Sequence, residues 1–162
     1  MAADILFQRS DWKFSYRVGA LIYHNGKLLM QRTAGEEGYA LPGGHVSCGE
    51  FSAETLAREF KEETGSALRV GRLCFVVELF FEWDKPCHQL NLIYLAELKN
   101  KEDLPQDSFH PVDDSGRERA ELEFRWVNIQ ELDRMKIYPA CVRPYLKDLP
   151  PYTVHLCENM IK

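Results

Sequence analysis

The chain alternates between apolar runs and polar segments that contain glycine or proline. Two apolar, β-prone runs at Tyr16–Tyr23 and 28–32 flank Asn25–Gly26, the pair most typical of a tight hairpin turn. Two longer, largely apolar runs, Leu73–Trp83 and His88–Leu98, are also expected to be strands, with a turn at residues 84–86 between them. The pattern therefore predicts two pairs of neighbouring strands.

Helical spacing replaces this pattern between Ser52 and Thr64, with Ser52 as the expected N-cap and Gly65 as the C-terminal stop. An α-helix advances about 100° per residue, so positions three and four apart share a face. The stripe expected to be buried contains Ala53, Leu56, Ala57, Phe60 and Thr64. The adjoining face carries three carboxylates, Glu59, Glu62 and Glu63.

The second half of the chain is more broken. A long polar loop with some strand is expected at Lys99–Ala120, a short strand at Glu123–Asn128, the start of a helix at Ile129–Met135 and a second short helix at Ala140–Lys147. Pro144 fits only the first turn of that helix, and the tail after Pro150–Pro151 has no clear pattern. Mixed strands with two or three helices predict one α/β sandwich domain over residues 1–162.

Composition and charge narrow the classes of partner. The formal net charge is −5 and the pI is about 5.6, which argues against a surface for long nucleic acids but not against small phosphorylated ligands. No apolar run reaches the roughly 18 residues of a membrane span, and the first residues do not resemble a signal peptide. The five cysteines form no C-x-x-C pair, so we expect free thiols in the cytoplasm and neither disulfides nor a zinc site.

Three carboxylates on one helix face repel one another, and each is expected to raise the pKa of the others. Solvent and arginine relieve such repulsion, and so do bound divalent ions. Oxygen ligands suit Mg²⁺ or Mn²⁺ rather than zinc. Because most acidic helix faces are simply solvated, this segment alone leaves both interpretations open.

The wider segment 44–66 decides between them. It follows the pattern G-x5-E-x7-R-E-U-x-E-E-x-G-U, in which U is a bulky aliphatic residue, and it resembles the Nudix box. All seven fixed positions match: Gly44, Glu50, Arg58, Glu59, Glu62, Glu63 and Gly65. Phe60 and Ser66 depart from the two U positions, which affects local packing rather than the charged face.

The resemblance implies an α/β/α sandwich with a mixed β-sheet and hydrolysis of a diphosphate bond in a small nucleotide, dependent on Mg²⁺ or Mn²⁺. It implies metal ligation by Glu59, Glu62 and Glu63, with the Gly44 carbonyl as a further ligand. Arg58 is expected to pair with Glu50 or Glu59 and to hold it in place. Proteins of this family commonly dimerise, so a homodimer is also expected.

Other site residues come from outside the box. The proton acceptor in catalysis is expected to be a box glutamate such as Glu62 or Glu63, or an acid of the long loop, with Glu121 favoured over Glu118. Arg17 and Arg32 flank the first hairpin and are candidates for contact with the substrate. A surface role explains each of these residues outside the box equally well.

Three other functions fit less well. A non-catalytic nucleotide sensor or interaction module of the same fold would usually lack a box glutamate or the arginine, and both are intact here. An enzyme that removes RNA caps would be expected to carry a basic surface. A prenyl diphosphate isomerase would need a catalytic cysteine in a motif that this chain does not show.

Overall fold

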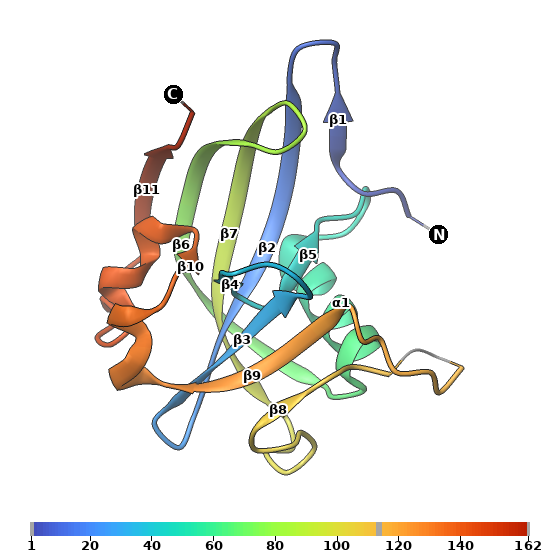
Figure 1. Cartoon of the computed structure of the whole chain (residues 1–162), viewed down its shortest axis with the longest axis vertical. Coiled ribbons are helices and arrows are strands. Elements are labelled where there is room, and N and C mark those ends of the chain that lie inside the picture. The colour runs from blue at the N-terminus through green and yellow to red at the C-terminus, as the bar shows by residue number, and fades with distance from the viewer. Residues whose placement is uncertain (1, 113–114, 162) are drawn as a thin grey trace.

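The hairpin predicted at Asn25–Gly26 joins the first two long strands of a computed structural model that describes residues 2–112 and 115–161 (Figure 1). Strands β2 (Lys13–His24) and β3 (Lys27–Thr33) pair antiparallel next to the turn. Both turn residues have positive φ, 49° and 72°, as a type I′ turn requires. The local sequence signal therefore sets the register of this pair.

The strands form one mixed sheet. Its main order is β10 (Ile137–Tyr138), β4 (Tyr39–Ala40), β3, β2, β7 (Pro86–Leu98), β6 (Leu68–Glu82) and β11 (Val154–Asn159). Strands β1 (Leu6–Gln8) and β5 (Gly43–His45) pair with β2, while β9 (Leu122–Asn128) pairs with β3 and with β8 (Ser108–Phe109). The β2–β7, β6–β11 and β4–β10 pairs are parallel, and the other pairs are antiparallel.

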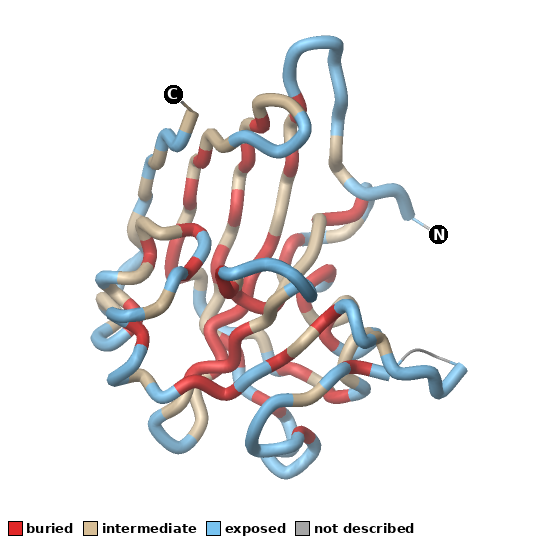
Figure 2. The backbone as a smooth tube through the Cα atoms, in the orientation of Figure 1, coloured by how far each residue is buried: buried red, intermediate tan, exposed pale blue. Residues whose placement is uncertain are grey.

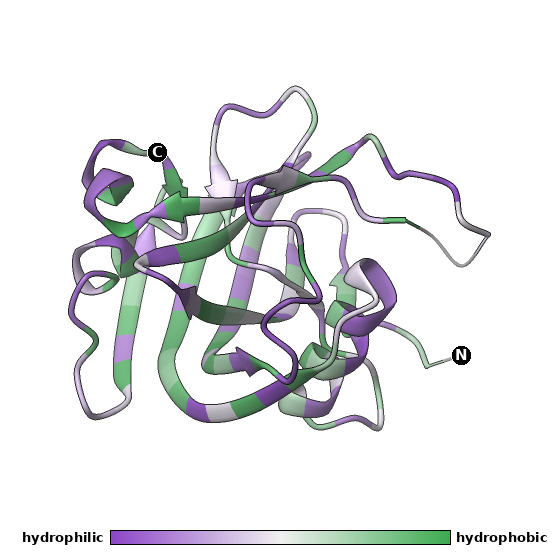
Figure 3. Ribbon diagram, turned by 90° about the horizontal axis from the view of Figure 1, so that it is seen from below, coloured by the Kyte–Doolittle hydropathy of each residue, from purple (hydrophilic) through white to green (hydrophobic). Residues whose placement is uncertain are grey.

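Helical segments cover both faces of this sheet. Helix α1 (Ser52–Thr64) packs through Leu56 and Phe60 on one apolar cluster. The segments η1 (Ile129–Arg134) and η2 (Ala140–Tyr145) pack on the other cluster. Figure 2 shows the buried positions running along the central strands between these layers, and Figure 3 shows apolar and polar positions alternating along the strands. The expected α/β/α layering and mixed sheet are confirmed.

The second helical layer differs from the expectation in its geometry. Both η1 and η2 are short 3₁₀ helices rather than α-helices. Pro144 is the fifth residue of η2, so the expectation that it would lie in the first turn is wrong. A single short 3₁₀ segment has few internal hydrogen bonds for a proline to remove.

The start of α1 also needs a correction. Phe51, not Ser52, is the N-cap residue, and the Phe51 N–H donates to the Glu54 carboxylate at 2.9 Å. The Ser52 hydroxyl instead lies 2.7 Å from the Tyr94 hydroxyl. The C-terminal end is as expected, because Gly65 takes a left-handed conformation and its N–H donates to Lys61 O.

The tail after the two prolines is strand β11, which pairs parallel with β6 in the register Val154 to Phe75. No local pattern predicts this strand, because its partner strand lies almost 80 positions earlier in the chain. None of the helices in the described residues is long and apolar enough to cross a membrane.

Candidate active site

The glycine turn and helix α1 approach closely. Strand β5 pairs with β2, with Gly43 opposite Gly19 and Gly44 opposite Val18. A Cβ at Gly43 would overlap the Val18 carbonyl oxygen, and a Cβ at Gly44 would lie 3.2 Å from Cγ of Glu59. Only glycine fits at position 43, and a side chain at position 44 would require Glu59 to shift, so the two glycines let the β5 backbone lie against the first of the three box carboxylates.

Arg58 ties the carboxylates of the box together. Its Nη1 donates to Glu59 at 2.8 Å and to Glu62 at 3.1 Å, while Nε and Nη2 donate to Glu50 at 3.0 Å each. Nη2 also donates to the Ser47 hydroxyl at 3.0 Å. These acidic partners raise the pKa of Arg58 above its usual value, with Glu50 the main cause. The guanidinium therefore stays charged and holds the carboxylates at fixed positions.

Glu63 differs from its neighbours because Arg58 does not reach it. Burial raises the pKa of Glu63 to about 7, and the nearby charge of Glu59 adds to this effect, while Arg119 and Arg17 oppose it. The expected mutual repulsion contributes to the raised pKa of Glu63, and burial is the larger cause. The buried Oε2 of Glu63 has no hydrogen-bond partner. A buried carboxylate oxygen without a partner is able to accept a cation or a hydrogen-bond donor.

The residues present fit a hard divalent ion. Glu59, Glu62 and Glu63 offer carboxylate oxygens from one face of α1, and Gly44 lies against Glu59. The unpartnered oxygen of Glu63 gives the cluster free ligand capacity. Oxygen donors without sulfur or nitrogen suit Mg²⁺ or Mn²⁺.

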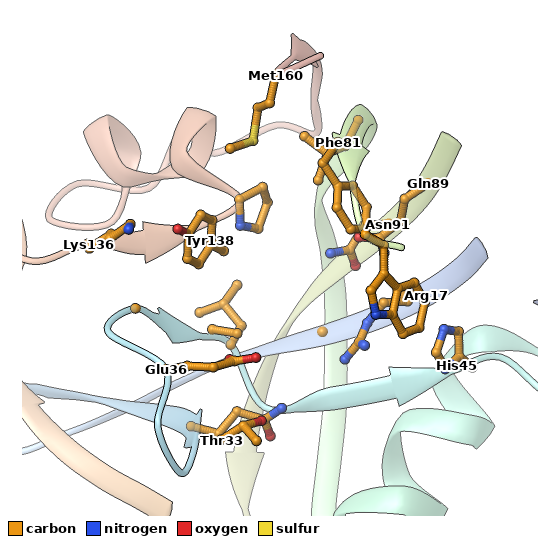
Figure 4. A pocket seen from close by; sticks show the side chains of 18 of the residues that line it. Arg17, Thr33, Glu36, His45, Phe81, Gln89, Asn91, Lys136, Tyr138 and Met160 are labelled. Carbon is orange, nitrogen blue, oxygen red and sulfur yellow. The ribbon is translucent and has the colours of Figure 1, made fainter. Parts of the chain in front are cut away.

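A cleft of about 900 Å³ opens beside this cluster. Figure 4 shows Tyr138 on one side of it and Phe81, Asn91 and Arg17 on the other. Arg17 links the cleft to the carboxylates, because it lines the cleft and also interacts electrostatically with Glu63 and Glu59. Burial lowers the pKa of Arg17, and these two glutamates oppose the shift. The side chain stays a cation at the point where the cleft meets the carboxylate face.

Unsatisfied polar atoms gather at the same place. Among the described residues, four buried side-chain atoms lack a partner: Gln31 Oε1, His45 Nε2, Glu63 Oε2 and Asn91 Oδ1. Three of these residues line the cleft, and the fourth belongs to the carboxylate face. Buried polar groups are normally paired. The cleft therefore offers hydrogen-bonding capacity that a polar ligand or water would fill.

The two arginines predicted to contact the substrate, Arg17 and Arg32, lie in different places. Arg17 lines the cleft, whereas Arg32 is not among its lining residues. Arg32 donates to Glu123 at 2.6 Å and lies over the Tyr39 ring. Neighbouring strand residues point to opposite sides, and it is Gln31 and Thr33 that line the cleft. The structure thus does not bring Arg32 to the cleft, because Glu123 on β9 holds it elsewhere.

Glu121 is exposed at the end of the long loop, where Arg119 donates to it at 2.8 Å. That hydrogen bond lowers the pKa of Glu121. Arg119 also acts on Glu63, so this end of the loop lies near the carboxylate face. The role of Glu121 as proton acceptor stays a prediction. Part of the same loop, at positions 113 and 114, lies outside the described residues.

Sequence reasoning missed several residues of the cleft. Gln89 and Asn91 line it from β7, and both are buried. The sequence pattern that could have identified them is two polar residues at alternate positions of a largely apolar strand. Tyr138 and Met160 reach the cleft from the C-terminal third of the chain, and no local pattern marks either of them.

The fold and site define a mixed α/β protein with a carboxylate-lined helix beside a polar cleft. The family model described as "NUDIX domain" matches residues 13–149. The chain therefore belongs to the Nudix family. A stretch of 76 residues is 36% identical to an ADP-ribose pyrophosphatase of Methanocaldococcus jannaschii and covers 44% of each chain. The chain thus matches less than half the length of this curated relative.

Solved structures agree on the fold. A NUDIX hydrolase from Nitrosomonas europaea superposes with a TM-score of 0.64 at 20% identity, over 90% of this chain and 78% of the other. An ADP-ribose pyrophosphatase from Streptococcus suis gives a TM-score of 0.58 at 14% identity, over 88% and 98% of the two chains. At these identities the likeness concerns the architecture alone.

Proposed function

We propose that this protein is a divalent-metal-dependent pyrophosphohydrolase that cleaves the diphosphate bond of a small nucleotide. The observation that carries the proposal is the unpartnered Oε2 of Glu63, which lies on a three-carboxylate face next to a cleft with further unpartnered polar atoms. A cation at the carboxylates and a polar ligand in the cleft would satisfy both sets of groups at once.

Each part of the site has a separate task in this proposal. Glu59, Glu62 and Glu63, with the Gly44 carbonyl, would hold Mg²⁺ or Mn²⁺. When bound, the ion supplies neutralisation of the diphosphate charge and activation of a water molecule. Arg58 orients Glu59 and Glu62 through its hydrogen bonds to their carboxylates and acts as a positioning residue. Arg17 would bind a phosphate oxygen at the mouth of the cleft.

The substrate class follows from the cleft. Its volume of about 900 Å³ suits a nucleotide, and its aromatic walls suit a stacked base. The M. jannaschii relative is named an ADP-ribose pyrophosphatase. We therefore put ADP-ribose and other nucleoside diphosphate derivatives first, ahead of nucleoside triphosphates.

The test is a screen for release of phosphate-containing products over a nucleotide panel, in Mg²⁺, Mn²⁺ or EDTA. Wild type, Glu62→Gln and Glu97→Gln are compared, since Glu97 is an exposed glutamate on β7 far from the box in sequence. We expect turnover that needs the metal, disappears in Glu62→Gln and persists in Glu97→Gln. No turnover of any compound by folded wild-type protein would overturn the proposal and favour a nucleotide sensor.

The proton acceptor is proposed to be either Glu121 or a box glutamate. Glu121→Gln, compared with Glu118→Gln on the same loop, separates the two. A loss of kcat confined to Glu121→Gln assigns the role to Glu121. Wild-type kcat in both variants assigns the role to a box glutamate.

Two further expectations concern the cellular compartment and the oligomeric state of the protein. All five cysteines are free, which supports a reducing compartment such as the cytoplasm. Exposed Phe7 stacks on Phe14, and exposed Trp12 packs on Phe80, so an aromatic patch lies at one end of the sheet. This patch supports a homodimer, which light scattering during size-exclusion chromatography would test.

A further inference from the structure

A second group of metal-binding side chains lies far from the box in sequence. Glu78 on β6 and His155 and Cys157 on β11 direct their polar atoms toward one another. His155 Nε2 lies 2.7 Å from Glu78 Oε2, and Cys157 Sγ lies 3.7 Å from each of those atoms. Three different ligand types therefore converge on one point.

The parallel pairing of β11 with β6 creates this arrangement. Cys157 lies directly opposite Glu78 in the register, and His155 precedes Cys157 by two residues on the same side of the strand. Both β11 residues are exposed, whereas Val154 and Leu156 point the other way and pack against the core. The group is thus open to ions from solvent while its backbone is fixed by the sheet.

The spacing of the three atoms matches that of zinc ligands. With Zn–S near 2.3 Å and Zn–N and Zn–O near 2.1 Å, tetrahedral coordination separates sulfur from nitrogen or oxygen by about 3.6 Å and nitrogen from oxygen by about 3.4 Å. The two sulfur distances agree with this value. The nitrogen–oxygen pair would open by less than about 1 Å when an ion replaces the shared hydrogen.

We propose that Glu78, His155 and Cys157 form a Zn²⁺ site, with water in the fourth position. Thiolate and imidazole ligands favour Zn²⁺ over Mg²⁺, which separates this site from the carboxylate face of α1. On binding, the Cys157 thiol loses its proton to solvent and its sulfur bonds to the ion, so that uptake releases a proton and changes no oxidation state.

The site also has a structural consequence. Strand β11 is an edge strand, and the ion would tie it to β6 through side chains as well as through the backbone. Met160 directly follows β11; its N–H donates to Phe80 O at 2.8 Å, and it lines the cleft. The zinc ion would therefore stabilise the position of one wall of the cleft. The site does not depend on the proposed hydrolase activity.

Titration of the metal-free protein with Co²⁺, followed by absorption, is the direct test. Cobalt bound through a thiolate gives an intense near-ultraviolet charge-transfer band, which the glutamates of α1 cannot produce. We expect this band to saturate at one ion per chain, to disappear in Cys157→Ser and to need at least about tenfold more Co²⁺ in His155→Ala. Excess Zn²⁺ should remove it.

Cys48→Ser is the matched control, since Cys48 is also an exposed free thiol, and it should keep the band. Zn²⁺ should raise the Tm of wild type and Cys48→Ser more than that of Cys157→Ser, while all three have equal Tm in EDTA. Absence of the band in wild type, or its persistence in Cys157→Ser, would overturn the site. An equal rise of Tm with Zn²⁺ in all three proteins would overturn the proposal that the ion ties β11 to β6.

Discussion

The carboxylate face of α1 and the adjoining cleft are built in opposite ways. The face is local: its glutamates and Arg58 lie within six residues of one helix, and the helical repeat alone brings them together. The cleft is assembled from β2, β3, β6, β7 and the C-terminal third of the chain. In the proposed function, the chemistry therefore depends on a short motif, while ligand selection depends on segments from several parts of the chain.

This contrast predicts that changes in the face lower kcat and changes in the cleft raise KM. The largest effect is expected for Glu62→Gln, which removes the charge of a proposed metal ligand without changing its shape. We expect kcat to fall by on the order of 10²–10⁴-fold, with KM changed by less than about fivefold. Steady-state kinetics in saturating Mg²⁺ measure both, and a change confined to KM would contradict the division.

Arg58→Lys should have the next largest effect. Lysine keeps the charge but cannot donate to Glu50, Glu59 and Glu62 at once, as Arg58 does. We expect kcat to fall by about 10–100-fold and stability to fall by only about 1 kcal/mol, because these ion pairs are partly exposed. Arg58→Ala should lose more stability than Arg58→Lys in urea unfolding. Equal kcat for Arg58→Lys and wild type would rule out the positioning role.

Arg17→Ala tests the cleft side of the comparison. Removing a cation at the boundary between cleft and carboxylates should raise KM by about 10–100-fold. Arg32→Ala is the control, since Glu123 holds Arg32 outside the lining of the cleft. Its KM should stay within about twofold of wild type. The opposite ranking of the two variants would restore Arg32 as the substrate contact.

Tyr138→Ala sharpens the role of the aromatic wall. Loss of one stacking surface should raise KM by about 3–10-fold and leave kcat nearly unchanged. Tyr152→Ala, an exposed tyrosine outside the cleft lining, is the control. An equal KM for the two variants would remove base stacking from the model of substrate binding.

The smallest effect is a gain in stability. Glu63 has a pKa of about 7 in the folded protein against an ordinary value of 4.5, so its ionisation disfavours folding. The cost is absent below about pH 4.5, grows as the pH rises and is complete above about pH 7. In metal-free buffer Glu63→Gln should gain about 1–2 kcal/mol, or roughly 3–6 °C in Tm, at pH 8 and little at pH 5. A gain of equal size at both pH values would refute this origin.

Local signals were read correctly where the neighbouring residues alone decide the conformation. The Asn25–Gly26 turn, the long strands and helix α1 follow from turn chemistry and hydrophobic period, and the tertiary structure leaves them in place. The N-cap at Phe51 was missed because the Glu54 carboxylate accepts the Phe51 N–H there. The 3₁₀ form of η1 and η2 was missed because both are single short turns set by packing.

The sequence by itself determined the family, through the motif at 44–66, and it also determined the carboxylate face, because a helical repeat turns spacing directly into geometry. Only the tertiary structure decided what surrounds that face. It brought Arg17 to the cleft and left Arg32 with Glu123, since successive strand residues point to opposite sides. It also made the tail a parallel edge strand and so placed Cys157 beside Glu78. The reason is that strand pairing between distant segments depends on the whole core rather than on either segment.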